Sequence, residues 1–458
     1  MAGNLKKGDI IELVLDNLAH GGDCVGHWSG LAVFIPGGIP GERIKAKITS
    51  CQKSYARGKI LEILESSQER IEPVCPVEQE CGGCQLQHMN YRAQLIHKKR
   101  VVEDLLRRIG GFKDIEVNQV IGADFPYNYR NKAQFPLSRD QRGLIATGFY
   151  QQGTHRVVFH DHCGIQHPLL NRVMKKTIEV LNEYKLTVYN EEKHRGLLRH
   201  LVIRAGICTN QALLIIVTKN ALFPVGKEIA NRVMQMVPEL TGVIQNINPR
   251  RTNVIMGEQM VLLAGQDYYV DYIGPVQFAI SPASFFQVNT LQTERLYRII
   301  RQYARLTGQE TVIDAYCGIG SIALYLAKDA GRIYGIEGVE AAINDAQKNT
   351  ELNNITNCFF QTGRVESELP RLLQEGIKPD LVILDPPRKG LADPVKEALL
   401  ATEPDRLIYV SCNPATLARD LAVLSRKYRI ELVQPIDLFP QTHHVETVTV
   451  MQREKIIG

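Results

Sequence analysis

The sequence predicts an α/β protein in three parts: a small OB-like β-barrel, a central α+β domain and a carboxyl-terminal doubly wound domain. Its 458 residues exceed the roughly 100–200 residues of a single domain. Short alternating segments fill the first 65 residues, and strand-like and helix-like segments alternate regularly after about residue 280. We therefore expect domains at residues 1–65, 66–275 and 276–458.

The composition is that of a globular protein, with 44% hydrophobic and 22% charged residues. The amino-terminal segment is charged and alternating, and no run approaches the roughly 20 apolar residues of a membrane-spanning helix. We therefore expect a cytoplasmic protein with no membrane association. In that reducing compartment the ten cysteines indicate metal binding or catalysis rather than a disulfide framework.

The first domain is expected to contain four strands separated by glycine-rich turns, at residues 9–18, 30–35, 42–51 and 56–64. Between Arg43 and Lys59 there are six basic residues and no acidic one, and Tyr55 lies among them. Small barrels commonly present such a basic, aromatic-bearing face to nucleic acid. A solvated charged face is the alternative explanation.

The central domain begins with an expected amphipathic helix from about Tyr91 to Ile109, ended by two glycines. Its apolar stripe is Leu95, Val102, Leu105 and Ile109, and we expect the helix, at 91–110, to pack on the carboxyl-terminal domain. Strand-like and helix-like segments then mix, which predicts an α+β domain; they are residues 168–184, 200–207, 211–218 and 226–237.

A nucleoside-cofactor site is predicted where three strands of the last domain end. The segment from Asp314 to Gly320 ends a strand and begins a helix, and its glycines permit a tight turn against a ligand. Glu337 ends the next strand, where a carboxylate can accept hydrogen bonds from both ribose hydroxyls. Asp385 begins an Asp-Pro-Pro-Arg sequence that holds it at a strand tip. Since that sequence has no obvious role in hydride transfer, a methyltransferase-type site is favoured over a nicotinamide site.

Cys412 follows another strand of this domain and precedes Asn-Pro, which indicates a turn at the working edge of the sheet. A thiolate there can add to C6 of uracil and make C5 nucleophilic enough to accept a methyl group. A general base must then remove the C5 proton. Glu446 is the candidate, and His443 or His444 are alternatives that the spacing does not separate.

A cysteine cluster is predicted in the central domain. Cys75, Cys81 and Cys84 lie close in sequence, with two glycines between the last pair, and Cys163 could complete a set of four. The spacing fits zinc and an iron–sulfur cluster about equally. A structural role is favoured, because the proposed chemistry transfers no electrons.

Taken together, these motifs resemble the RNA uracil-C5 methyltransferase family over nearly the whole chain. The segments 129–135 and 281–289 resemble further family sequences. The resemblance implies a TRAM barrel that binds RNA, a central domain with a [4Fe-4S] cluster, and a Rossmann-like domain that uses S-adenosylmethionine. By the same resemblance, the ligands of the cluster are expected to be Cys75, Cys81, Cys84 and Cys163. The residues expected to bind the cofactor are Gln287, Tyr316, Glu337 and Asp385. The resemblance assigns Cys412 as the nucleophile and Glu446 as the base.

The family's tRNA enzymes usually lack the TRAM and cluster regions, so the resemblance implies 23S ribosomal RNA as the substrate. By the resemblance, zinc is the less favoured metal. The protein is expected to be a monomer. The family often has Asn where this chain has Ser321, so no cofactor role is assigned there. The alternatives are a tRNA uracil-C5 enzyme and an RNA cytosine-C5 enzyme. A methylthiolating radical enzyme would need a different cysteine triplet, and an intact cofactor site disfavours a non-enzymatic RNA-binding module.

Overall fold

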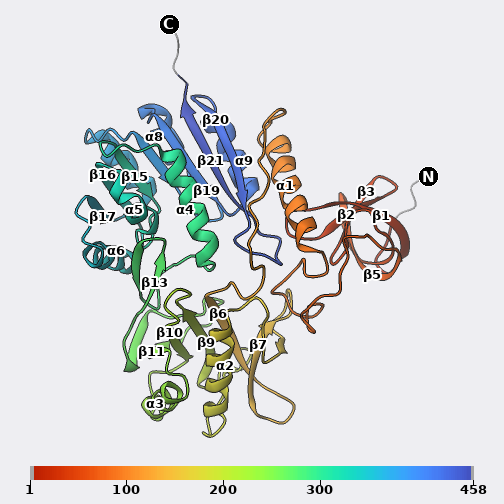
Figure 1. Ribbon diagram of the computed structural model, residues 1–458. Coiled ribbons are helices and arrows are strands. Elements are labelled where there is room, and N and C mark those ends of the chain that lie inside the picture. Colours follow the sequence, from red (N-terminus) through yellow and green to blue (C-terminus); the bar gives the residue numbers. More distant parts are fainter. Residues whose placement is uncertain (1–4, 455–458) are drawn as a thin grey trace.

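The amino-terminal domain is a closed barrel of five strands in the computed structural model, which describes residues 5–454 (Figure 1). The strand order is β1-β2-β3-β5-β4. Four strands lie where they were expected, and β2 was missed because Gly26 and His27 interrupt its apolar alternation. Gly26 is required there, since an added Cβ would lie 2.4 Å from the Val14 carbonyl oxygen. The strands are β1 Ile10–Leu18, β2 Cys24–Trp28, β3 Leu31–Ile35, β4 Arg43–Cys51 and β5 Tyr55–Glu65.

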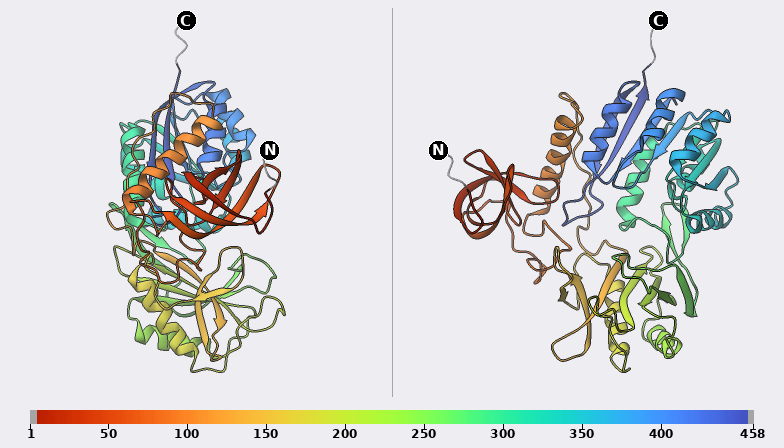
Figure 2. Two further views of the ribbon diagram at one scale, coloured as in Figure 1. Left: turned by 90° about the vertical axis from the view of Figure 1, so that its right-hand side faces the viewer. Right: turned by 180° about the vertical axis from the view of Figure 1, so that it is seen from behind.

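Helix α1 (Tyr91–Arg108) lies between the barrel and the carboxyl-terminal domain, as both views show (Figures 1 and 2). It packs against α9 (Pro414–Leu424), and Val102 and Leu106 join the core of that domain. The predicted stripe is wrong in part, because Leu95 and Leu105 are half-buried and Ile109 is 47% exposed. The helix instead buries Gln94, His97 and Lys98, whose polar groups find partners in the segments packed against them.

The middle domain is built on a seven-stranded sheet in the order β12-β11-β10-β9-β6-β7-β8. Helices α2 and α3 share one apolar core with one face of this sheet, and the other face joins a core shared with the carboxyl-terminal domain. The elements are β6 Lys132–Arg139, β7 Ile145–Tyr150, β8 Val157–Phe159, α2 Pro168–Leu181, β9 Leu198–Ala205, β10 Ala212–Thr218, α3 Gly226–Met236, β11 Leu240–Ile247 and β12 Gln259–Gly265.

A hairpin of two strands leads into the carboxyl-terminal domain, whose sheet has the order β17-β16-β15-β18-β19-β21-β20. The elements are β13 Tyr269–Ile273, β14 Val276–Ile280, α4 Thr290–Ala304, β15 Thr311–Ala315, α5 Ser321–Leu326, a 3-10 turn Ala327–Asp329, β16 Arg332–Glu337, α6 Glu340–Leu352, β17 Cys358–Thr362, α7 Val365–Gln374, β18 Leu381–Leu384, α8 Asp393–Thr402, β19 Arg406–Ser411, α9, β20 Tyr428–Ile436 and β21 Glu446–Arg453.

This sheet is parallel from β17 to β19, and β21 alone runs in the opposite direction, because it is antiparallel to both of its neighbours, β19 and β20. Helices α4, α5 and α6 pack on one face, and α1, α7, α8 and α9 pack on the other. The predicted α/β architecture with an amino-terminal barrel is confirmed. Among residues 5–454, no helix combines the length and apolar character needed to cross a membrane.

Candidate active site

The turn between β15 and α5 has an unusual backbone conformation at three of its residues. Tyr316, Gly318 and Gly320 have φ values of 66°, 54° and 74°, in the left-handed region. The two glycines adopt it without a steric cost, whereas Tyr316 is held there by its surroundings. The Tyr316 hydroxyl is buried and has no hydrogen-bond partner within the described part of the chain. The turn therefore has two features expected of a ligand site: glycines that let a ligand approach the backbone, and a buried hydroxyl donor that has no partner among residues 5–454.

Glu337 lies beside this turn because β16 pairs with β15. Its carboxylate accepts hydrogen bonds from the Gly318 amide at 3.2 Å and the Val339 amide at 2.9 Å. These bonds fix the carboxylate at the strand end while leaving acceptor capacity on both oxygens. The side chain is thus positioned as the prediction for a ribose-binding group requires.

Two further carboxyl groups lie near the turn. Asp314 is fully buried, and one oxygen accepts from the Ala323 amide at 3.0 Å while the other has no partner among residues 5–454. Burial, together with the nearby Asp385, raises the pKa of Asp314 to about 8. Burial raises the pKa of Asp385 to about 7. A cationic ligand bound here would therefore compensate two poorly solvated carboxyl groups.

Gln287 joins Asp314, Tyr316 and Asp385 in lining a single cavity. It is 9% exposed, and its backbone carbonyl accepts a hydrogen bond from the Asn131 side chain at 2.8 Å. Reasoning from residue patterns did not single out Gln287, because the segment before α4 carries no glycine turn or strand-end motif. Only the family resemblance pointed to it, and the structure places it with the other predicted cofactor residues.

Cys412 and Glu446 are brought together by the antiparallel pairing of β19 and β21. Ser411 and Thr447 form the last pair of this ladder; Cys412 directly follows Ser411 in the chain, and Glu446 directly precedes Thr447. The two side chains are close enough for the charge of Glu446 to act on the Cys412 thiol. Cys412 is half-buried rather than packed in hydrocarbon, and Glu446 is 3% exposed.

The electrostatic environment of this pair is acidic. Burial, Glu446 and Asp385 raise the pKa of Cys412 to about 11, against the opposing effect of Arg388. Burial and Asp385 likewise raise the pKa of Glu446 well above its ordinary value. Without a bound cation, Cys412 is therefore mainly a thiol at neutral pH, and a positive charge beside it would favour the thiolate.

The loops after β18 and β19 are tied together, because the side-chain amide of Asn413 donates to the Arg388 carbonyl at 3.0 Å. Since β15, β18 and β19 are neighbouring parallel strands, Asp385 and Cys412 lie at the same edge of the sheet as the glycine turn. A substrate that contacts Cys412 would therefore lie next to a ligand held by that turn.

The two histidines that were alternative bases lie just before Glu446. Their ring centroids are 4.0 Å apart, with His443 3.1 Å from the Gln85 side-chain oxygen and His444 3.4 Å from Arg388. Burial, His20 and other cations lower the pKa of His443 to about 4, and burial, His443 and Arg388 lower that of His444 to about 3. Such depressed values make both rings weak bases at neutral pH.

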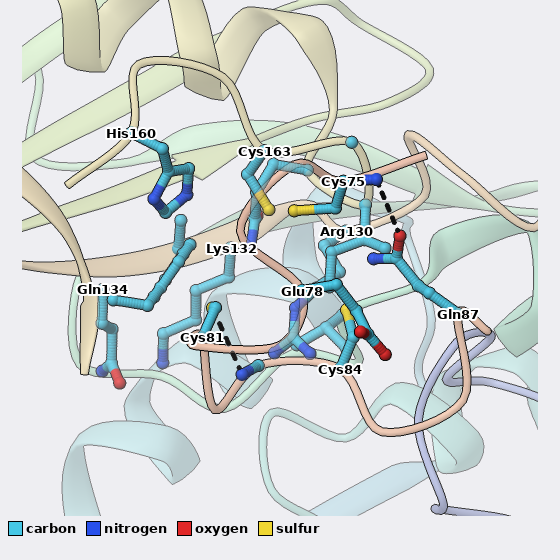
Figure 3. A pocket seen from close by; sticks show the side chains of 17 residues that line it. Cys75, Glu78, Cys81, Cys84, Gln87, Arg130, Lys132, Gln134, His160 and Cys163 are labelled. Atoms are coloured by element: carbon cyan, nitrogen blue, oxygen red, sulfur yellow. Dashed lines mark hydrogen bonds between the residues drawn. The ribbon is translucent and has the colours of Figure 1, made fainter. Parts of the chain in front are cut away.

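The four predicted cluster ligands line one cavity of about 360 Å³, although Cys163 lies far along the chain from the other three (Figure 3). All are free thiols, and the Gly83 amide donates to the Cys81 sulfur at 3.4 Å. Burial and the neighbouring cysteines raise the pKa of Cys84 to about 12 and of Cys163 to about 11. Arg130 and Lys132 line the same cavity and bring positive charge to it.

Within residues 5–454, no three His, Cys, Asp or Glu side chains converge closely enough to hold a single metal ion. In a [4Fe-4S] cluster each thiolate binds a different iron, so its ligands surround a cavity instead of meeting at one point. The four thiols line one cavity and do not meet at a single point in the described part of the chain.

Comparisons with known proteins show the family to which the chain belongs. A family model described as tRNA (Uracil-5-)-methyltransferase matches residues 274–454, and a TRAM domain model matches residues 5–61. Uncharacterized RNA methyltransferases from Halalkalibacterium halodurans and a Bacillus cereus strain are 45% and 43% identical, over 98% and 99% of this chain and 98% of each relative. The structure of a Pyrococcus abyssi tRNA (uracil-54, C5)-methyltransferase in complex with S-adenosyl-L-homocysteine is 28% identical, with a TM-score of 0.75, and the match covers 96% of this chain and 100% of that one.

Proposed function

Because the chain belongs to the S-adenosylmethionine-dependent RNA uracil-5 methyltransferase family, we propose that it methylates C5 of uracil in 23S ribosomal RNA through a covalent adduct on Cys412. The position of Glu446 near Cys412 at the end of the β19–β21 ladder, at the same sheet edge as the glycine turn, is the observation that carries this proposal. It supplies a nucleophile and a base close together, as uracil-C5 chemistry requires.

In this proposal Gln287, Tyr316, Glu337 and Asp385 hold S-adenosylmethionine. The residues present fit that group. Gln287, Tyr316 and Asp385 line one cavity, in which the Tyr316 phenol has no partner among residues 5–454 and the Asp385 carboxyl is poorly solvated. Glu337 lies beside the same turn and has free acceptor capacity. The cofactor supplies an electrophilic methyl group when bound. Glu337 accepts from its ribose, and the carboxyl groups stabilise its positive charge.

The protein's own residues would then act in order. The Cys412 thiolate forms a bond to C6 of uracil, and the electron pair of the C5–C6 double bond moves onto the C4 carbonyl as an enolate. That pair would form the new bond from C5 to the methyl carbon as the bond between this carbon and the sulfonium sulfur breaks, and the electron pair of the broken bond would stay on the sulfur. Glu446 then takes the proton from C5, the double bond re-forms, and the C6–S bond breaks to release the thiolate.

A direct test offers labelled cofactor to the protein with 23S ribosomal RNA and with tRNA separately. We expect 5-methyluridine in the ribosomal RNA digest. Methylation of tRNA alone would support the second candidate, a tRNA enzyme, which the substrate named for the Pyrococcus abyssi structure favours. Formation of 5-methylcytidine in either RNA would instead overturn uracil as the target.

RNA binding by the barrel is proposed from its basic face. Lys47 and Lys59 are exposed and pair directly across β4 and β5. Like charges in such a pair are destabilising, so a polyanion that neutralises both would stabilise this surface. Arg57, on the same outward face, is already paired with Asp23 at 2.8 Å.

Replacing both lysines, as Lys47→Ala/Lys59→Ala, is expected to weaken RNA binding. If each contacts one phosphate, the slope of log affinity against log salt should decrease by about 2, at roughly 0.9 per contact. Filter binding across a salt series measures this slope. A matched control is Lys328→Ala/Lys348→Ala in the last domain, which should leave the slope unchanged; an unchanged slope in the barrel variant would place RNA elsewhere.

For the four cysteines we propose a [4Fe-4S] cluster with a structural role. The ring of thiols around one cavity, the Gly83 amide aimed at sulfur, and the positive charge of Arg130 and Lys132 support it. Four thiolates carry a charge that buried cations offset. Bound in this way, the cluster would join the segment before α1 to the middle domain through Cys163.

Cys84→Ser is expected to lose the cluster. Protein purified without oxygen should contain about four iron atoms per chain, and the variant should contain few or none. Iron and acid-labile sulfide assays, together with the visible absorbance of the cluster, measure this. Cys208→Ser is the matched control, because Cys208 is an exposed thiol of the middle domain outside the cavity. About one zinc per chain and no iron would contradict the cluster.

A further inference from the structure

The loop from Asp437 to Val445 joins β20 to the strand that begins with Glu446, and Gln441 lies at its centre. Gln441 has φ +70°, in the left-handed region that side chains other than glycine rarely adopt. Its side chain is 2% exposed. A buried residue with strained backbone persists only where its surroundings fix it, and such residues are concentrated at functional sites.

The surroundings of Gln441 are two other segments of the chain. Its carbonyl oxygen accepts hydrogen bonds from the Gln85 and Leu86 amides at 3.1 and 3.0 Å. Its own amide donates to the Gln94 side-chain oxygen at 3.1 Å, and the Gln94 side-chain nitrogen donates back to the Gln441 side chain at 2.9 Å. Gln441 thus joins helix α1 and the loop before Glu446 to the segment at residues 75–85, which contains Cys75, Cys81 and Cys84 and is called the cysteine segment below.

Other bonds fix the loop on either side of Gln441. The Tyr129 hydroxyl donates to the Pro440 carbonyl at 3.0 Å, and the buried Lys98 ammonium donates to the Asp437 carboxylate at 2.6 Å. Residues from α1, the middle domain and the cysteine segment therefore all hold this loop. Such redundancy exceeds what packing alone needs, since any apolar loop could close the same connection.

The link to the cysteines is direct. Gln85 follows Cys84 in the chain, bonds to the Gln441 carbonyl through its amide, and reaches His443 through its side chain at 3.1 Å. A displacement of the cysteine segment therefore moves the loop within a few residues of Glu446. Glu446 must meet the C5 proton at hydrogen-bond distance, so a shift of about 1 Å is costly.

We propose that Gln441 is a positioning residue for Glu446, and that it transmits the position of the cysteine segment to the active site. This inference rests on the proposed function of Cys412 and Glu446. It assigns Gln441 no contact with the RNA or the cofactor. The cysteine cavity then affects methylation through the loop before Glu446 rather than through electron transfer.

The test uses Gln441→Gly and Gln441→Ala. Glycine accepts the left-handed backbone and keeps the amide that donates to Gln94 and the carbonyl that Gln85 and Leu86 bind, so this variant should fold. It loses two side-chain bonds, the one from the Gln94 side-chain nitrogen and the one to the Pro126 carbonyl. Alanine loses the same bonds and keeps the strain. Each variant is mixed with cofactor and RNA containing ordinary uridine. Turnover and the fraction of protein covalently joined to methylated RNA, seen on a denaturing gel, are both measured.

If Gln441 positions the base, Cys412 addition and methyl transfer continue while removal of the C5 proton slows. Turnover should fall roughly tenfold, as expected for the loss of one or two hydrogen bonds, and the adduct should accumulate. The matched control is Gln245→Ala, which removes a buried amide with three hydrogen bonds in the middle domain. It should lower thermal stability without raising the adduct.

Gln441 variants that fold and turn over without extra adduct would overturn the positioning role. That outcome differs from failure of the proposed function, in which the unmodified protein makes no 5-methyluridine or Glu446→Gln traps no adduct. The cluster link has its own measurement. Cys84→Ser should also raise the adduct fraction, and an unchanged fraction in that variant would separate Gln441 from the cysteine segment.

Discussion

Cys412→Ala is expected to abolish 5-methyluridine formation, with turnover falling by roughly 10⁴-fold or more, as for other nucleophiles whose loss removes the covalent route. Uracil C5 becomes nucleophilic only when a thiolate has added at C6, and no other cysteine of the described chain directly adjoins the β19–β21 ladder. Release of label from the methyl donor into RNA measures the loss. Cys358→Ala is the matched control, because Cys358 lies in the edge strand β17.

The same nucleophile can be identified by trapping. In RNA carrying 5-fluorouridine, fluorine replaces the proton that Glu446 must remove, so the methylated adduct cannot collapse. We expect a stable complex that survives denaturation, with the RNA attached to the peptide containing Cys412. An active enzyme that forms no such complex, or attaches the RNA to another residue, would falsify the assignment of the nucleophile. Sequencing the trapped RNA also identifies the uridine that is modified.

The sequence indicated that several predicted site residues share one edge of the sheet, but it did not indicate how Cys412 and Glu446 are brought together. Asp314 and Glu337 lie at the carboxyl ends of β15 and β16, and Asp385 and Cys412 directly follow β18 and β19. All four strands have clear apolar character, so the common edge followed from the rule for parallel sheets. Local patterns do not reveal that β21 inserts antiparallel between β19 and β20. That insertion sets Glu446 near Cys412, and it explains why sequence spacing could not separate Glu446 from the two histidines.

The errors around α1 have a similar origin. A helical stripe is read from apolar residues, and α1 instead buries Gln94 and Lys98 because their partners, Gln441 and Asp437, come from the far end of the chain. A polar residue in a helix is normally assigned to the solvent face. The long-range contacts that make the loop before Glu446 rigid could therefore not be predicted from local sequence patterns.

Glu446→Gln is expected to stop the reaction at the methylated adduct. Glutamine keeps the size of the side chain and removes its ability to accept the C5 proton, so loss of the base should lower turnover by about 10²–10⁴-fold. The steps before proton removal depend on Cys412 and the cofactor site, and they should survive. With ordinary uridine RNA, the variant should therefore accumulate a covalent complex that carries the transferred methyl group.

This outcome separates the candidate bases. His443→Asn and His444→Asn should reduce turnover less and accumulate little adduct, because burial keeps both rings weakly basic and Glu446, unlike either histidine, belongs to the strand paired with β19. A denaturing gel with doubly labelled RNA and methyl donor compares the three variants directly. If the adduct accumulated in either histidine variant and not in Glu446→Gln, that histidine would be the base. Glu446 would then act only as a charge that keeps Cys412 protonated until a cation binds beside it.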